Sequence, residues 1–254
     1  TLAPPPAALI ENAAQLNAIM LPAIKDANQL TETLQDNRIN ALCIGPGFGL
    51  GAREAELLRS ALETTRPGPD PGPQTGGQGG GPGSSPGRGL VLDADALTLL
   101  SQDKTLFGKL HKTCILTPHA GEFARLFPDI AETLNAPATK GPAYSKVDAA
   151  RDAAKRAGCV VLFKGPDTVI ADPTGRCSIN ASVYERSAPW LATAGSGDVL
   201  AGFITGLLAR GFEPMQAADT GAYLHTECAL NFGPGLIAED IPEQLPQVFK
   251  NLGL

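Results

Sequence analysis

Short apolar runs alternate with amphipathic segments along most of this chain. Runs of three to five residues predict buried strands, and they cover residues 40–44, 89–92, 114–116, 159–163 and 168–171. Apolar positions at helical spacing predict helices over residues 28–34, 53–62, 97–110, 120–126, 147–157, 199–208 and 216–230. Because strand, polar loop and helix repeat in this order, the pattern predicts an α/β fold with a mostly parallel sheet covered by helices.

One segment interrupts this repeat of strand, polar loop and helix. Residues 66–88 are mostly Gly, Pro, Ser and Gln, which cannot bury a core, so we expect a disordered surface insertion. The order of strands and helices resumes unchanged after it. This favours an insertion within a single domain over residues 1–254 rather than a domain boundary. The chain begins at Thr1 rather than Met, so we expect a cut or processed start.

Composition and charge narrow the classes of partner. The chain has 254 residues, of which 43% are hydrophobic and 18% charged, and its formal net charge is −6. Without a basic stripe, this argues against nucleic acid or an anionic membrane as a partner. The five cysteines are scattered, with no C-x-x-C pair to suggest zinc, and we expect free thiols in the reducing cytoplasm. Neither a signal peptide nor a membrane-length apolar run is visible.

The strongest chemical pattern is the turn before the predicted helix at 199–208. The glycines of Gly195-Ser196-Gly197 permit a close approach to backbone N–H groups that have no helical partner. Such a turn predicts an anion hole for a phosphate or an oxyanion. Asp198 follows directly and can take a proton from a hydroxyl held over the hole. On the local sequence alone, a tight turn with Asp198 as an N-cap is an equal alternative.

Other polar loops follow the predicted strands, at the sheet edge where ligands bind in parallel α/β folds. Lys164 can reach a phosphate, although an ordinary turn with a solvated lysine is favoured when that segment is taken alone. His119 and Glu122 can contact a ligand or a hydrated metal ion, or they can simply cap a helix. Asp93 and Asp95 fit helix N-caps and, more weakly, a site near magnesium.

Two common nucleotide cradles are absent from the sequence. The glycines at 45–49 lack the G-x-G-x-x-G spacing of a dinucleotide fingerprint, and no Walker A motif is present. His111 and His225 lie in no comparable loop, so we expect them to be structural or exposed. A nucleotide, if bound, must therefore be held by the loops described above.

Five motifs nevertheless follow one another in a specific order: IGPGFG at 44–49, VLDADAL at 91–97, LTPHAGE at 116–122, FKGPDT at 163–168 and TAGSGD at 193–198. This set resembles the ADP-dependent NAD(P)H-hydrate dehydratases of the ribokinase-like superfamily, and the resemblance covers nearly the whole chain from Asn12 on. Pro-His-x-Gly-Glu with the later Gly-Ser-Gly-Asp separates this family from the sugar kinases. The resemblance implies a ribokinase-like three-layer sandwich.

The resemblance also implies a repair reaction on the nicotinamide cofactor. ADP, the phosphoryl donor, phosphorylates the hydroxyl of hydrated NADH or NADPH; phosphate then leaves, and NAD(P)H, AMP and phosphate are the products. Asp198 would be the catalytic base, and a magnesium ion would bridge the phosphates. The residues implied to hold the hydrated cofactor are Gly49, His119, Ala120, Gly121, Glu122, Arg125 and Asp198. Those implied to hold the nucleotide are Lys164, Gly165, Pro166, Asp167, Thr168, Ala194, Gly195, Ser196 and Gly197.

The chain departs from its relatives at its start. The family begins with a strand, a turn rich in glycine and serine, and an alanine-rich helix, so we expect this chain to be N-terminally truncated. In many bacteria an epimerase domain is fused upstream, and relatives form oligomers, often tetramers; we expect a homo-oligomer here. Two other functions remain open: an ATP-dependent kinase of a vitamin precursor, and a non-catalytic nucleotide-binding module.

Overall fold

The computed structural model describes residues 1–68, 87–137 and 143–254. Within these ranges one sheet has the strand order β1-β2-β3-β4-β5-β6. Its strands are β1 (Ala41–Ile44), β2 (Gly89–Leu92), β3 (Cys114–Leu116), β4 (Val160–Phe163), β5 (Asp167–Ala171) and β6 (Cys177–Ala181). Strands β1 to β4 pair in parallel, whereas β5 and β6 pair antiparallel. The prediction of a mostly parallel sheet is confirmed.

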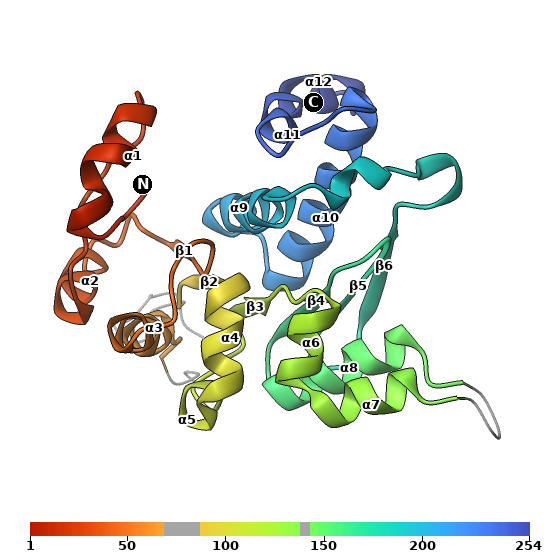
Figure 1. Ribbon diagram of the computed structural model, residues 1–254, viewed down its shortest axis with the longest axis horizontal. Coiled ribbons are helices and arrows are strands. Elements are labelled where there is room, and N and C mark those ends of the chain that lie inside the picture. The colour runs from red at the N-terminus through yellow and green to blue at the C-terminus, as the bar shows by residue number, and fades with distance from the viewer. Residues whose placement is uncertain (69–86, 138–142) are drawn as a thin grey trace, which may run out of the picture.

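Helices cover both faces of the sheet (Figure 1). One face packs against α3 (Ala52–Thr65), α4 (Ala94–Gln102), α6 (Ala120–Leu126) and α8 (Lys146–Ala157). The other face packs against α9 (Ser196–Ala209) and α10 (Pro214–Phe232). The predicted three-layer α/β architecture is thereby confirmed.

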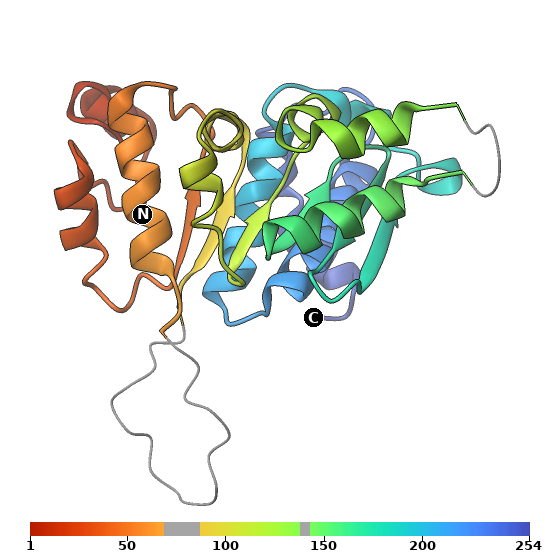
Figure 2. The same cartoon turned by 90° about the horizontal axis from the view of Figure 1, so that it is seen from below.

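The shorter elements lie around these layers. They are η1 (Pro6–Ala8), α1 (Leu9–Gln15), α2 (Ala27–Thr33), α5 (Lys104–Phe107), α7 (Pro128–Asn135), η2 (Tyr184–Arg186), η3 (Pro189–Ala192), α11 (Asp240–Glu243) and α12 (Leu245–Asn251). Figure 2 shows α1 and α2 beyond β1 at one end of the molecule, with the antiparallel strands toward the other end.

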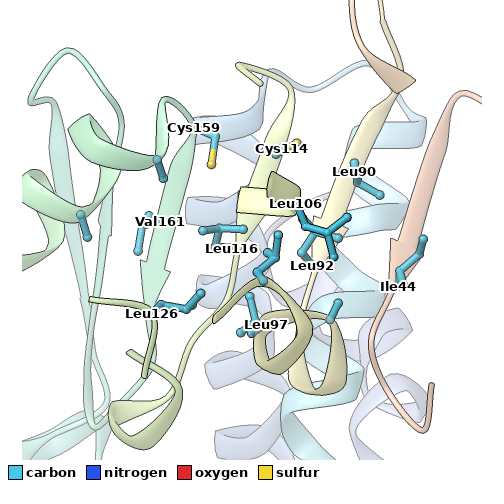
Figure 3. Packing of buried hydrophobic residues seen from close by; sticks show 14 of the residues in the cluster. Ile44, Leu90, Leu92, Leu97, Leu106, Cys114, Leu116, Leu126, Cys159 and Val161 are labelled. Atoms are coloured by element: carbon cyan, nitrogen blue, oxygen red, sulfur yellow. The ribbon is translucent and has the colours of Figure 1, made fainter. Parts of the chain in front are cut away.

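The core follows the two-residue period of buried strands. Leu90 and Leu92 of β2 point toward α3 and α4, while Val91 between them packs against α9 and α10. Figure 3 shows Leu90, Leu92, Leu97 and Leu116 in the core layer on the α3 and α4 side of the sheet. Since neither face of β2 meets water, the strand is apolar throughout rather than alternating with polar residues, as its sequence predicted.

Several elements differ from the sequence prediction. The helix expected over 97–110 is two helices, α4 and α5, because Asp103 caps α5 through the N–H of Thr105. Helix α7 and strand β6 were not predicted. Strand β6 is a polar edge strand, whose Ser178 hydroxyl donates to the Asp219 carboxylate on α10, so it carries no apolar run.

The predicted insertion leaves and re-enters the fold at one point. The N–H of Arg88 donates to the carbonyl of Thr65, 3.0 Å away, which links the end of α3 to the start of β2. Residues 69–86, on which the expectation of disorder mainly falls, lie outside the described residues.

Two expectations from composition can be compared with the described part of the chain. All five cysteines are free, and Cys114, Cys159 and Cys228 are buried, as expected of small hydrophobes. No helix in the described ranges is both long enough and apolar enough to cross a bilayer.

Candidate active site

The loops after β1 and β2 are tied together at the carboxyl edge of the sheet. Gly45, at φ +138°, packs so closely on Asp93 that a Cβ there would lie 1.8 Å from the Asp93 carbonyl oxygen. Only glycine permits this approach. Further along the same loop, the N–H of Gly49 donates to Oδ2 of Asp95, 2.7 Å away. The turn that carries Gly49 is therefore fixed by the start of α4.

Lys164, at the end of β4, makes the central ion pair of this edge. Its Nζ lies 2.8 Å from Oδ1 of Asp93 and 3.9 Å from Oε2 of Glu122. The Asp93 side chain is only 1% exposed and that of Lys164 is 18% exposed. A buried carboxylate requires such a partner. The solvated-lysine alternative is therefore wrong, and Asp93, although at the N-cap position of α4, makes no side-chain capping bond.

The segment that begins α6 is a capping box. Nδ1 of His119 accepts the N–H groups of Gly121 and Glu122, at 2.9 and 3.4 Å, and Oε2 of Glu122 accepts the N–H of His119 at 2.8 Å. The capping interpretation of this segment is confirmed. Because Nδ1 is an acceptor, the neutral ring carries its proton on Nε2, which lies 3.5 Å from Oε1 of Glu122. Glu122 is buried, whereas Ala120 and Arg125 are exposed.

The glycine turn, residues 195–198, begins α9 on the opposite side of the sheet. Gly195 caps the helix in the left-handed conformation, at φ +83°. Two bonds hold the turn from behind: Ser196 Oγ donates to the Leu191 carbonyl at 2.6 Å, and Nε2 of His225 donates to the Ser196 carbonyl at 2.9 Å. Burial lowers the pKa of His225 to about 4, and Lys164 lowers it further, against the opposing effect of the Ser196 carbonyl. The ring is therefore neutral near pH 7.

The donors of this turn are open. The N–H groups of Gly197 and Asp198 have no acceptor among the residues that the structure describes. They lie at the partly positive end of a fourteen-residue helix. This arrangement suits a phosphate or a developing oxyanion.

Asp198 is an exposed carboxylate in the first turn of α9. Gly195 caps the helix, so the interpretation of Asp198 as an N-cap is wrong. Partial desolvation of the carboxylate raises the pKa of Asp198, the Asp93 carboxylate raises it further, and Lys164 opposes both. A raised pKa makes the ionised carboxylate a stronger base. A Cβ on Gly197 would lie 3.3 Å from Nζ of Lys164, so the glycine turn lies directly against the Lys164–Asp93 pair.

The lysine turn, residues 164–168, joins β4 to β5. Its main chain is tied to the loop after β3 by the bond from the Lys164 N–H to the Pro118 carbonyl, at 2.8 Å. Thr168 is buried, and its hydroxyl donates to the Gly165 carbonyl at 2.9 Å. One contact of this turn was missed by the sequence analysis: Nζ of Lys146 lies 2.7 Å from the Asp167 carbonyl. Lys146 begins an ordinary amphipathic helix, which gives no chemical signal in the sequence.

The structure thus gathers most of the predicted site residues at one edge of the sheet. The lysine turn, Glu122 and the glycine turn meet around Asp93, and Gly49 is joined to them through Asp95. Arg125 makes no hydrogen bond or ion pair with this cluster within the described part of the chain. Two cavities, of about 370 and 420 Å³, lie elsewhere, between α7 and α8 and between α10 and α12. None of the predicted site residues lines either cavity.

Comparison with known families agrees with this geometry. The model of the NAD(P)H-hydrate dehydratase family matches residues 6–246, nearly the whole chain. The chain belongs to this family. All five motifs of the sequence analysis fall inside the matched region.

Relatives in this family are longer proteins. A bifunctional NAD(P)H-hydrate repair enzyme of Mycobacterium leprae is 34% identical over 219 residues, which cover 85% of this chain and 38% of that protein. Its counterpart in Moorella thermoacetica is 40% identical over 167 residues, which cover 64% of this chain and 29% of that protein. The chain therefore spans about a third of the length of these relatives.

Solved structures of similar fold include a ribokinase-like superfamily protein of Enterococcus faecalis, with a TM-score of 0.70 and 23% identity over 98% of this chain and 75% of that one. The ADP/ATP-dependent NAD(P)H-hydrate dehydratase of Bacillus subtilis, co-crystallised with ATP and Mg²⁺, has a TM-score of 0.63 and 24% identity over 91% of this chain and 72% of that one. At these identities the likeness establishes the ribokinase-like fold.

Proposed function

We propose that this chain catalyses the ADP-dependent dehydration of hydrated NADH or NADPH, giving NAD(P)H, AMP and phosphate. One observation carries the proposal. Asp198, an exposed carboxylate with a raised pKa, follows directly on the open N–H groups of a helix start. A base beside an anion hole is the pair of groups that phosphoryl transfer to a hydroxyl requires.

In this proposal the two turns have different tasks. Asp198 accepts the proton of the substrate hydroxyl as that oxygen attacks the terminal phosphoryl group of ADP. The N–H groups of Gly197 and Asp198 hold negative charge on the transferred group, and AMP is the leaving group. Loss of phosphate from the phosphorylated intermediate, with a proton from the neighbouring ring carbon released to water, then restores the double bond of the reduced nicotinamide ring.

The residues assigned to binding follow from their places around this base. We assign the nucleotide to the lysine turn and to residues 194–197, because these two segments lie next to each other beside Asp93. We assign the hydrated cofactor to Gly49 and to residues 119–122, which lie on the β1 and β3 side. Arg125 belongs to this second set only through the resemblance.

A magnesium ion fits the chemistry of the donors present. Mg²⁺ prefers oxygen ligands and commonly takes one or two protein carboxylates together with phosphate oxygens. The buried carboxylates of Asp93 and Glu122 both face Lys164 beside the glycine turn, so these two residues would hold the ion. The bound ion would neutralise phosphate charge.

The deciding experiment is an absorbance measurement at the reduced-nicotinamide band, with the protein, hydrated NADH, magnesium and either ADP or ATP. A rise with ADP is expected. A rise with ATP alone would keep the reaction and change the donor. A stable phosphorylated product would instead establish the kinase, and tight nucleotide binding without turnover would establish the binding module.

We also propose that the chain works in the cytoplasm as a homo-oligomer such as a tetramer, within a protein that carries an epimerase domain. Five free cysteines support a reducing compartment. Exposed apolar side chains at the β6 edge, Ile179 and Tyr184, support a contact between copies. The family relatives are named bifunctional, which supports a second activity. Light scattering of the purified chain measures its oligomeric state directly.

A further inference from the structure

Lys146, the first residue of α8, closes the lysine turn from the face of the sheet opposite α9. Its Nζ donates to the Asp167 carbonyl at 2.7 Å, to Oδ1 of Asp167 at 3.0 Å and to the Lys164 carbonyl at 3.3 Å. One ammonium group thus joins the two ends of the turn. A flexible side chain that is fixed by three acceptors restricts the backbone that carries them.

The remaining carbonyls of the turn are also engaged. The Gly165 carbonyl accepts the Thr168 hydroxyl, and the Pro166 carbonyl accepts the N–H of Ser182 at 2.7 Å. All four carbonyl oxygens of residues 164–167 therefore have donors, and two of the four depend on Lys146. Loss of the ammonium group would leave these two oxygens to water and free the turn to rearrange.

The surroundings of Lys146 leave it little freedom. Its side chain is 18% exposed, and Nζ lies 4.7 Å from the centre of the Phe163 ring, at the end of β4. A Cβ on Gly165 would lie 2.6 Å from Nζ, so the ammonium group occupies the space that a side chain at 165 would need. Asp167, which supplies the charged acceptor, has a side chain that is 57% exposed, so the two carbonyl contacts matter as much as the ion pair.

We propose that Lys146 is a positioning residue that holds the lysine turn in the conformation that binds nucleotide. The inference deepens the proposed function and rests on it, because the nucleotide is assigned to this turn. Lys146 acts from behind the turn, through main-chain oxygens, and not by contact with substrate. Its loss should therefore weaken nucleotide affinity and leave the chemical step nearly unchanged.

Hydrogen exchange tests the holding of the turn without any substrate. Lys146→Met keeps the length of the side chain and removes the charge, and it should speed amide exchange in a peptide covering residues 163–169. Lys155→Met, on the exposed surface of the same helix, is the matched control and should leave that peptide unchanged. Equal exchange in wild type and Lys146→Met would overturn the inference, whatever the activity shows.

Steady-state kinetics and calorimetric ADP binding test the consequence for nucleotide. Lys146→Met should raise the KM for ADP by about five- to ten-fold, with kcat within about two-fold of wild type. Lys146→Arg, which keeps the charge and the donors, should recover most of the affinity. Asp167→Asn, which spares both carbonyl contacts, should have a smaller effect than Lys146→Met.

The outcomes separate the two proposals. Faster exchange with an unchanged KM would overturn the positioning role, and so would a fall in kcat alone. A wild-type chain that binds no ADP, and yet shows faster exchange in Lys146→Met, would contradict the proposed function and not the bracing of the turn. If Lys146→Met does not fold, the ADP affinities of Lys146→Arg and Asp167→Asn can still be compared with wild type to rank the same contacts.

Discussion

The glycine turn and the lysine turn meet at the same edge of the sheet, yet they are built in opposite ways. In the glycine turn the groups that face the site are open: two N–H groups and the Asp198 carboxylate have no hydrogen-bond partner in the described part of the chain. In the lysine turn most groups are engaged, since the four carbonyls of residues 164–167 have donors and Lys164 is paired with Asp93.

In the proposed function, the glycine turn supplies the groups that react and the lysine turn supplies a fixed surface for the nucleotide. Open N–H donors and an unpartnered carboxylate are free to meet a ligand, and in the proposed function they lie where charge develops during phosphoryl transfer. The lysine turn is pre-organised by contacts within the protein, so it can present a fixed surface. The bonds behind the glycine turn, from His225 and Ser196, give its open face the same rigidity. The comparison can be tested by removing one group at a time from each turn.

Loss of the open base should have the largest effect. Asp198→Asn keeps the shape of the side chain and removes its ability to accept a proton, so NADH formation should fall by about a thousand-fold. ADP affinity and the melting temperature should stay near wild type, since this exposed carboxylate makes no hydrogen bond within the described residues. An Asp198→Asn protein with full activity would remove Asp198 from the mechanism.

Removal of the buried Asp93 carboxylate should have the next largest effect, and this effect should be on stability. Asp93→Asn removes the carboxylate at 2.8 Å from the Lys164 ammonium and leaves that of Glu122 at 3.9 Å, so the free energy of unfolding should drop by about 3 kcal/mol. Denaturant titration measures this loss. The double variant with Lys164→Met removes both charges and should be more stable than Asp93→Asn, although it should bind ADP poorly. A double variant that is less stable than either single variant would show that the two residues do not act as a pair.

Most of the fold could be predicted because its buried strands carry a direct signature. Strands β2 and β3 and helix α6 have the predicted bounds, since apolar runs and polar loops mark both their ends. Strand β6 was missed because it lies at the edge, where polar side chains bond to α10 instead of packing into the core. The split between α4 and α5 was missed because a side-chain cap, rather than a glycine or proline, causes it.

For the site, the sequence indicated which residues lie together at the sheet edge better than how they are connected. The glycine turn and Lys164 were singled out by local composition. The pairing of Lys164 with Asp93 was not, because residues 71 positions apart meet only once the strand order is known. Lys146 gave no signal for the same reason. Capping of α6 by His119 was one of two interpretations that the sequence left open, and the hydrogen-bond geometry was needed to decide between them.

Acid should loosen the glycine turn through His225. The pKa of His225 is lowered to about 4, mainly by burial, against 6.5 in an unfolded chain. The neutral ring therefore contributes stability above pH 6.5, and this contribution is lost as the pH falls through 4. By pH 5 about 2 kcal/mol should be gone, and His225→Gln should flatten the slope of stability against pH between these limits.

His111 provides the matched control for this prediction, because burial also lowers its pKa to about 4 and it lies beside Thr65, near the insertion. His111→Gln should flatten the slope similarly. Only the His225 variant should also weaken ADP binding near pH 7, measured by calorimetry, since His225 alone bonds to the Ser196 carbonyl. Equal ADP affinities in the two variants would show that bracing from behind does not matter to the glycine turn.

The smallest effect should come from a methyl group at the cap of α9. Gly195→Ala forces φ +83° on a residue with a Cβ, which would also lie 3.1 Å from Cβ of Ala238. The free energy of unfolding should fall by about 1 kcal/mol, and ADP binding should weaken because the open N–H groups follow directly on this cap.

Gly202→Ala, on the same helix, should do the reverse. A Cβ there meets nothing within 4 Å, and alanine favours a helix interior by up to about 1 kcal/mol, so stability should rise while ADP binding stays unchanged. Urea titration and calorimetry on the two variants separate the need for a left-handed cap from a general effect of glycine in α9. If Gly195→Ala binds ADP as tightly as Gly202→Ala, the open face of the glycine turn does not depend on the conformation of Gly195.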